Sequence, residues 1–130
     1  NVNLIQYKEW PDHGVPSRAS FFQFLRIYRL FRANMKHSHS PIVVHCLAGV
    51  GRTGTFIAID MMLDYIASEM FARRIPSLAK VAEIVTGLRA CRRRLVDGHG
   101  QYAWIYNFLQ YAFWNPYRER IGLPRFFSQQ

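Results

Sequence analysis

The feature that most constrains this chain is a short apolar run that leads into a glycine-containing loop. The run Pro41-Ile42-Val43-Val44-His45 is rich in β-branched residues and fits a strand buried on both faces. A helix is expected from Thr53 to about Met70. A buried strand, a loop and a helix in direct succession are typical of α/β folds, in which a sheet and its helices share one core.

The rest of the sequence predicts one more strand and three more helices. A short strand is expected at Leu4-Ile5-Gln6-Tyr7. Helices are expected after Ser17 and after Ser77, because each serine can cap a first helical turn, and a last helix is expected from about Tyr102 to Phe113. Two strands are too few for a complete sheet, so part of the sheet is expected to lie outside this chain.

Composition and charge limit the class of protein. The 130 residues carry 17 Lys and Arg against 8 Asp and Glu, a net charge of +9, which favours anionic partners such as phosphorylated ligands. Two cysteines are too few for a disulfide framework, and no apolar run approaches the roughly 18 residues that a membrane-spanning helix needs. The composition argues against a small secreted scaffold, a coiled coil and a membrane protein. It predicts a soluble domain, or a piece of one, in a reducing compartment.

The loop after the apolar run has the residues of an anion-binding nucleophilic site. Cys46 ends the run, and Gly49 and Gly51 permit backbone torsions that turn the N–H groups of the loop inward. The N-terminus of the following helix adds partial positive charge, and the planar fork of Arg52 can clamp two oxygens of an anion. The same donors stabilise a thiolate, so Cys46 is expected to be ionised near neutral pH and strongly nucleophilic.

Two motifs in this chain resemble those of cysteine-dependent protein tyrosine phosphatases, in particular the tyrosine-specific branch. The first is His-Cys, five residues, then Arg followed by Ser or Thr; the second is the tripeptide Trp10-Pro11-Asp12, thirty-four positions before the cysteine. A match at this many positions is strong for a short motif. The positions that match the first motif are His45, Cys46, Gly49, Gly51, Arg52, Thr53 and Gly54.

The resemblance implies hydrolysis of phosphotyrosine in proteins through a phosphocysteine on Cys46, without a metal or a cofactor. Asp12 would protonate the leaving phenolate and later accept a proton from water. Thr53 would donate its hydroxyl to the Cys46 sulfur, Gln101 would position the water, and His45 would orient the loop. Substrate phosphate would be bound by Leu47, Ala48, Gly49, Val50, Gly51 and Arg52.

The resemblance also implies a fold and a domain boundary. It implies an α/β phosphatase fold with a central mixed sheet flanked by helices, present here without the N-terminal half of the sheet. Residues 1–114 would form the C-terminal half of the catalytic domain, and residues 115–130 a basic tail. The location would be the cytoplasm, or the cytoplasmic part of a receptor-type parent.

One loop departs from the pattern of the family, which has Gln-Thr-x-x-Gln-Tyr late in the domain. The aligned stretch is Asp97-Gly98-His99-Gly100-Gln101-Tyr102, of which the first four residues are predicted to be a loop, so a carboxylate stands where the first glutamine is expected. A carboxylate repels a phosphoryl dianion and offers no N–H. We therefore expect Asp97 to hamper attack of water on the phosphocysteine more than formation of that intermediate.

Several other interpretations stay open at this point. The chain could be a pseudophosphatase, or a phosphotyrosine-binding module with impaired turnover; a phosphoinositide or dual-specificity phosphatase is disfavoured because the cysteine loop contains no lysine. The signature could also be a glycine-rich strand–helix turn around a core cysteine. His37-Ser38-His39 lacks nearby metal-ligating partners, and the clusters Arg73-Arg74 and Arg92-Arg93-Arg94 lack a nucleic-acid-binding motif. The predicted partners are phosphotyrosine proteins, without nucleic acid and without obligate membrane contact, and the oligomeric state is open.

Overall fold

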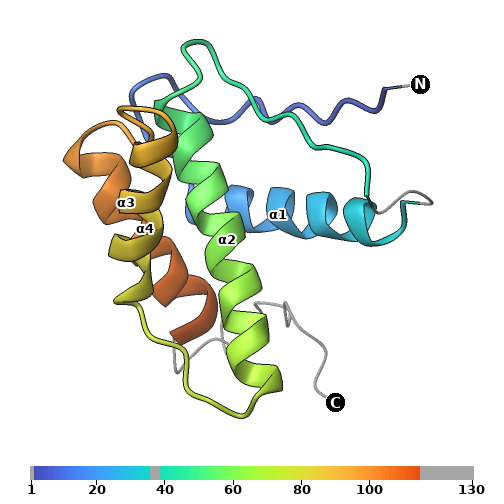
Figure 1. The fold of residues 1–130 in the computed structure, drawn as a ribbon. Helices are drawn as coiled ribbons and strands as arrows, with labels where there is room; N and C mark the ends of the chain where they lie inside the picture. Colours follow the sequence, from blue (N-terminus) through green and yellow to red (C-terminus); the bar gives the residue numbers. More distant parts are fainter. Residues whose placement is uncertain (1, 36–38, 115–130) are drawn as a thin grey trace.

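The computed structural model describes residues 2–35 and 39–114, and this part of the chain is helical (Figure 1). The bounds of the helices are α1 Arg18–Ala33, α2 Gly51–Phe71, α3 Lys80–Cys91 and α4 Gly98–Leu109, followed by a π-helical turn, η1, at Gln110–Trp114. The hypothesis of a metal site at His37-Ser38 and the predicted basic tail at 115–130 lie outside the described residues. Within the described part, no helix is both long enough and apolar enough to cross a bilayer.

The predicted central mixed sheet is wrong for the described residues, which contain helices and no strand. The two segments predicted to be strands, at 4–7 and 41–45, have no regular secondary structure. A strand exists only through hydrogen bonds to a neighbouring strand, and neither segment has such a neighbour here. Val43 is 84% exposed, so the burial predicted for residues 41–45 is also absent there; in the other segment Leu4 is 78% exposed.

The first two predicted helices form, and the cap of the first is confirmed. Ser17 precedes α1, and its hydroxyl accepts a hydrogen bond from the backbone N–H of Ser20 at 3.2 Å. Helix α2 begins at Gly51, two residues before the predicted start, because the backbone of Val50 accepts from Gly54 at 3.0 Å and closes the first turn there. Arg52 and Thr53 therefore lie inside the first turn of α2.

The last two helices form with shifted starts. Helix α3 begins at Lys80 because Ser77 makes a separate turn, in which its hydroxyl accepts from the N–H of Ala79 and its carbonyl accepts from the N–H of Lys80. Helix α4 begins at Gly98, inside the predicted loop, with Asp97 in extended backbone as the residue before it. These shifts place Asp97 at the entrance of a helix rather than in the middle of a loop.

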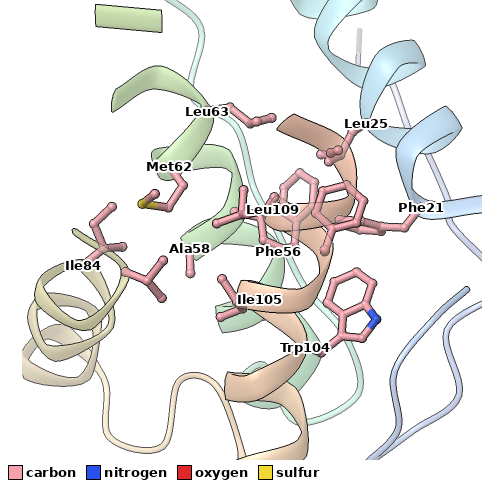
Figure 2. Packing of buried hydrophobic residues seen from close by; sticks show 14 of the residues in the cluster. Phe21, Leu25, Phe56, Ala58, Met62, Leu63, Ile84, Trp104, Ile105 and Leu109 are labelled. Atoms are coloured by element: carbon pink, nitrogen blue, oxygen red, sulfur yellow. The ribbon is translucent and has the colours of Figure 1, made fainter. Parts of the chain in front are cut away.

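Helix α2 lies at the centre of the fold and packs against α3 and α4 (Figure 2). An aromatic cluster joins α1 and α4 and includes Trp10, whose ring lies 5.4 Å from that of Phe21 and 5.8 Å from that of Trp104. The loop that carries Asp12 is thereby anchored in the core at one end. The fully buried larger side chains are Phe21, Phe22, Leu25, Ile59, Met62, Leu63, Ile66, Val81, Val85, Ile105, Phe108 and Leu109.

Candidate active site

The candidate site lies at the N-terminal end of α2, where the chain turns from residues 41–45 into the helix (Figure 1). We call residues 46–50 the cysteine loop and residues 10–14 the acid loop. The cysteine loop turns sharply at Gly49, which has φ +71, a conformation that side chains other than glycine's rarely adopt. This turn directs the backbone N–H of Gly49 to the sulfur of Cys46, at 3.3 Å.

The half-buried sulfur of Cys46 is held by hydrogen-bond donors. The hydroxyl of Thr53 donates to it at 3.1 Å, in addition to the N–H of Gly49. Burial raises the pKa of the Cys46 thiol, but hydrogen bonds from the Thr53 hydroxyl and from the backbone N–H groups of Thr53, Gly49 and Val50 outweigh it and lower the pKa to about 7. A substantial fraction of Cys46 is thiolate at neutral pH, which is the form required of a nucleophile.

We expect alkylation of Cys46 by iodoacetamide to follow a titration with a midpoint near pH 7, because only the thiolate reacts. Thr53→Val removes the hydroxyl that stabilises the thiolate, so the midpoint should move to higher pH. The rate should be measured by mass spectrometry in a Cys91→Ser background, so that only Cys46 is followed. Thr86→Val, on the exposed face of α3, is the matched control and should leave the midpoint unchanged. A midpoint near that of an ordinary cysteine, about pH 8.5, would contradict the hydrogen-bonding argument.

Arg52 joins the acid loop to the first turn of α2. Its Nη1 donates to the carbonyl of Trp10 at 3.1 Å, and its Nη2 lies 3.1 Å from Oδ1 of Asp12. Its Nε is buried and has no hydrogen-bond partner among the described residues. A buried donor without an acceptor destabilises a fold by about 1–3 kcal/mol. Arg52 and Thr53 are adjacent residues of α2. Arg52 contacts Asp12, and Thr53 contacts Cys46.

Gln101 lies in the first turn of α4, and its side chain is only 2% exposed. Its Oε1 accepts from the backbone N–H of Asp97 at 3.0 Å and from the hydroxyl of Thr55 at 3.4 Å. Its Nε2 donates to the carbonyl of Gly14 at 3.3 Å. The amide therefore links α4 to both α2 and the acid loop.

Asp97 has its carboxylate among basic side chains. Its Oδ1 accepts from Arg94 at 3.3 Å, and its Oδ2 lies 3.7 Å from Nδ1 of His13 in the acid loop. Its Cβ lies 3.2 Å from the point where a Cβ on Gly51 would stand, which places Asp97 against the start of α2. The residue that departs from the family pattern is thus near the cysteine loop and in contact with the acid loop.

Arg92 is a site residue that the sequence did not single out. Its Nη2 donates to the carbonyl of Ala48 at 3.1 Å, and its guanidinium lies beside Gly49. The Ala48 carbonyl and the Gly49 N–H belong to one peptide group, so a donor on the oxygen strengthens the N–H that faces the sulfur. The run of three arginines carried no signal that distinguished the first from the other two.

The remaining predicted residues line the same region. Leu47 and Ala48 are exposed at the turn of the cysteine loop, while Val50 and Gly51 join it to α2. The exposed His45 ring lies 3.4 Å from the carbonyl of Cys46 through Nδ1. Among the described residues, no three His, Cys, Asp or Glu side chains group in a way that could hold a metal ion.

Comparison with known sequences shows the family of this chain. The sequence model of the family described as protein-tyrosine phosphatase covers residues 1–111. The chain is 41% identical over 110 residues to tyrosine-protein phosphatase Lar of Drosophila melanogaster, covering 82% of this chain and 5% of that protein. It is 41% identical over 109 residues to receptor-type tyrosine-protein phosphatase epsilon of Rattus norvegicus, covering 83% and 14%. With tyrosine-protein phosphatase corkscrew of Drosophila melanogaster the identity is 36% over 109 residues, covering 81% and 12%. The chain spans only a small part of the length of these relatives, and it belongs to the protein-tyrosine phosphatase family.

Proposed function

We propose that this chain contributes the nucleophile, the phosphate-binding loop and the general acid to the hydrolysis of phosphotyrosine in proteins. The observation that carries the proposal is the Cys46 sulfur, which accepts from the Thr53 hydroxyl and the Gly49 N–H and has a pKa of about 7. The names of the relatives, which are tyrosine-protein phosphatases, support the substrate class. The net charge of +9 suits an anionic substrate.

In the first step, the Cys46 thiolate attacks the phosphorus of phosphotyrosine. The S–P bond forms as the P–O bond to the phenol oxygen breaks, and the proton of Asp12 passes to that oxygen. The loose transition state needs positioning and positive charge, which Arg52 and the N–H groups of the cysteine loop would supply. The contact of Arg52 with Asp12 supports this assignment, because it places the acid beside the group that would hold the phosphate.

In the second step, water attacks the phosphocysteine. The P–O bond to water forms as the S–P bond breaks, Asp12 takes the proton from water, and phosphate leaves. The hydroxyl of Thr53 stabilises the departing thiolate, which its 3.1 Å contact with Cys46 supports. Gln101 would position the water; its contact with Gly14 supports a place next to the acid loop. We infer a cytoplasmic location, or the cytoplasmic part of a receptor-type parent, from the reactive thiol and the receptor-type relative.

The proposal predicts a phosphocysteine that can be trapped. The protein containing this chain, with its natural flanking sequence, is mixed rapidly with a phosphotyrosine peptide, denatured at short times and digested. Mass spectrometry should find one phosphoryl group on Cys46 that appears before free phosphate accumulates. A phosphoserine peptide of the same sequence is the control and should give neither adduct nor phosphate.

Two other outcomes have defined meanings. An adduct that forms and then persists without further turnover would favour the alternative, a phosphotyrosine-binding protein with impaired turnover, with Asp97 as the first residue to test. Hydrolysis of the peptide with no phosphoryl group on Cys46 at any time would contradict the proposed mechanism.

A further inference from the structure

The acid loop is held at both of its ends, at Trp10 by the core and by Arg52, and at Gly14 by contacts to uncharged groups. The carbonyl of Gly14 accepts from Nε1 of Trp10 at 2.9 Å and from Nε2 of Gln101 at 3.3 Å, and the N–H of Gly14 donates to the carbonyl of Pro11 at 3.1 Å. Between these ends, His13 has φ +56 and a side chain that is 80% exposed. The position of Asp12 therefore depends on what contacts the middle of the loop.

The imidazole of His13 lies between two carboxylates. Its Nε2 lies 3.9 Å from Oδ2 of Asp12, and its Nδ1 lies 3.7 Å from Oδ2 of Asp97. The other oxygen of each carboxylate faces an arginine, Arg52 for Asp12 and Arg94 for Asp97. When the imidazole is protonated, the positive charges of His13 and Arg94 flank the carboxylate of Asp97, between the acid loop and the entrance of α4.

Asp97 is held in place by contacts of its own backbone and Cβ. Its backbone N–H donates to the buried Gln101 side chain at 3.0 Å, and its Cβ stands against Gly51 at the start of α2. An attraction between His13 and Asp97 therefore pulls the acid loop toward the start of α2, which the cysteine loop joins.

We propose that the ion pair between His13 and Asp97 positions the acid loop, so that Asp12 can deliver its proton to the leaving group. The proposal rests on the proposed function, in which Asp12 is the general acid. His13 and Asp97 are positioning residues, because they act through Asp12 and need not touch the substrate. The carboxylate at position 97, which departs from the family pattern, thereby acquires a role in the first step.

Aryl phosphates with different leaving groups separate this role from a general loss of structure. Phenyl phosphate releases a basic phenolate and needs the proton of Asp12, whereas dinitrophenyl phosphate releases a stable anion and does not. We expect His13→Gln and Asp97→Asn each to lower the rate of phosphocysteine formation from phenyl phosphate by about threefold at about pH 6, the upper end for an exposed ion pair. Dinitrophenyl phosphate should react at nearly the rate of the wild type in both variants.

The double variant tests whether the two side chains act as a pair. Its rate with phenyl phosphate should equal that of either single variant, because removing either partner already removes the whole interaction. His99→Gln, an exposed histidine two residues beyond Asp97, is the matched control and should behave as the wild type.

The outcomes distinguish a failure of the ion-pair proposal from a failure of the proposed function on which it rests. Multiplicative losses in the double variant, or equal losses on both substrates, would overturn the ion-pair proposal while leaving the phosphatase mechanism intact. Equal losses on both substrates in Asp12→Asn would show that Asp12 is not the general acid, and this would remove the basis of the proposal. The measurements use the protein with its natural flanking sequence and single-turnover conditions.

Discussion

Replacing Cys46 with serine is expected to reduce the turnover of phosphotyrosine peptides by about 10⁴-fold or more, which corresponds to about 5 kcal/mol of barrier. The Cys46 thiol has its pKa lowered to about 7 by the surrounding donors. A serine hydroxyl in the same place stays protonated, because its unperturbed pKa lies far above that of a thiol. The nucleophile is therefore lost, while the phosphate-binding groups of the loop and Arg52 remain.

The same variant should still bind phosphotyrosine peptides, and this retention makes the result specific to the chemical step. Binding can be followed by calorimetry, since the variant does not consume the peptide. Cys91→Ser is the matched control: Cys91 is exposed at the end of α3, so its replacement should alter neither binding nor turnover. A variant at position 46 that retains more than about a hundredth of wild-type turnover, with an unchanged melting temperature, would show that another group is the nucleophile.

Most of the site that could be predicted from sequence is continuous along the chain; Asp12 and Gln101 are the exceptions, and they were predicted from the resemblance to the phosphatase family. Cys46, Gly49 and Thr53 lie within eight positions, and backbone geometry at one helix N-terminus brings the Gly49 N–H and the Thr53 hydroxyl to the sulfur. The cap at Ser17 was predictable for the same reason, since it involves the N–H only three residues away. Local chemistry of this kind leaves a signature in residue type and spacing.

Contacts between distant segments left no such signature. Arg92 contacts Ala48, forty-four positions away, and Gln101 contacts Gly14, eighty-seven positions away. In each case the sequence shows a polar residue of ordinary type, and only the packing of α3 and α4 against α2 brings it to the loops. The ion pair of His13 with Asp97 is of the same kind.

The predicted sheet failed because strand formation depends on a partner. β-Branched residues at 41–45 favour extended backbone, and the backbone there is irregular and largely exposed. A strand needs hydrogen bonds across a ladder to a second segment, whereas a helix satisfies its own backbone within four residues. The apolar periodicity of α1 and α3 was therefore sufficient to predict those helices, and the composition of 41–45 was not sufficient to predict a strand.

The second large expected effect is on stability, at Gly54 in the first turns of α2. A Cβ added there would stand 2.4 Å from the backbone nitrogen of Val96 and 2.8 Å from the carbonyl carbon of Leu95. These are backbone atoms, and Val96 already has φ +64, an unfavourable conformation for a β-branched residue. Overpacking of this kind destabilises by about 1–3 kcal/mol or more. Because the clash is with backbone atoms, we take the upper end of about 3 kcal/mol; after the gain of about 1 kcal/mol in helix propensity, we expect Gly54→Ala to lower the free energy of unfolding by about 2 kcal/mol.

Gly87→Ala is the matched control, because Gly87 also lies inside a helix, α3, and nothing stands within 4 Å of its added Cβ. There the gain in helix propensity acts alone, so the melting temperature should rise slightly, whereas Gly54→Ala should lower it by several degrees.

The Gly54→Ala variant should also react more slowly with iodoacetamide at Cys46. The N–H of Val96 donates to the carbonyl of Val50 at 3.2 Å, so a displaced 95–96 segment pulls on the residue that joins the cysteine loop to α2. Equal melting temperatures for the two alanine variants would mean that the segment at 95–96 can move away freely, and that Gly54 serves the loop in another way.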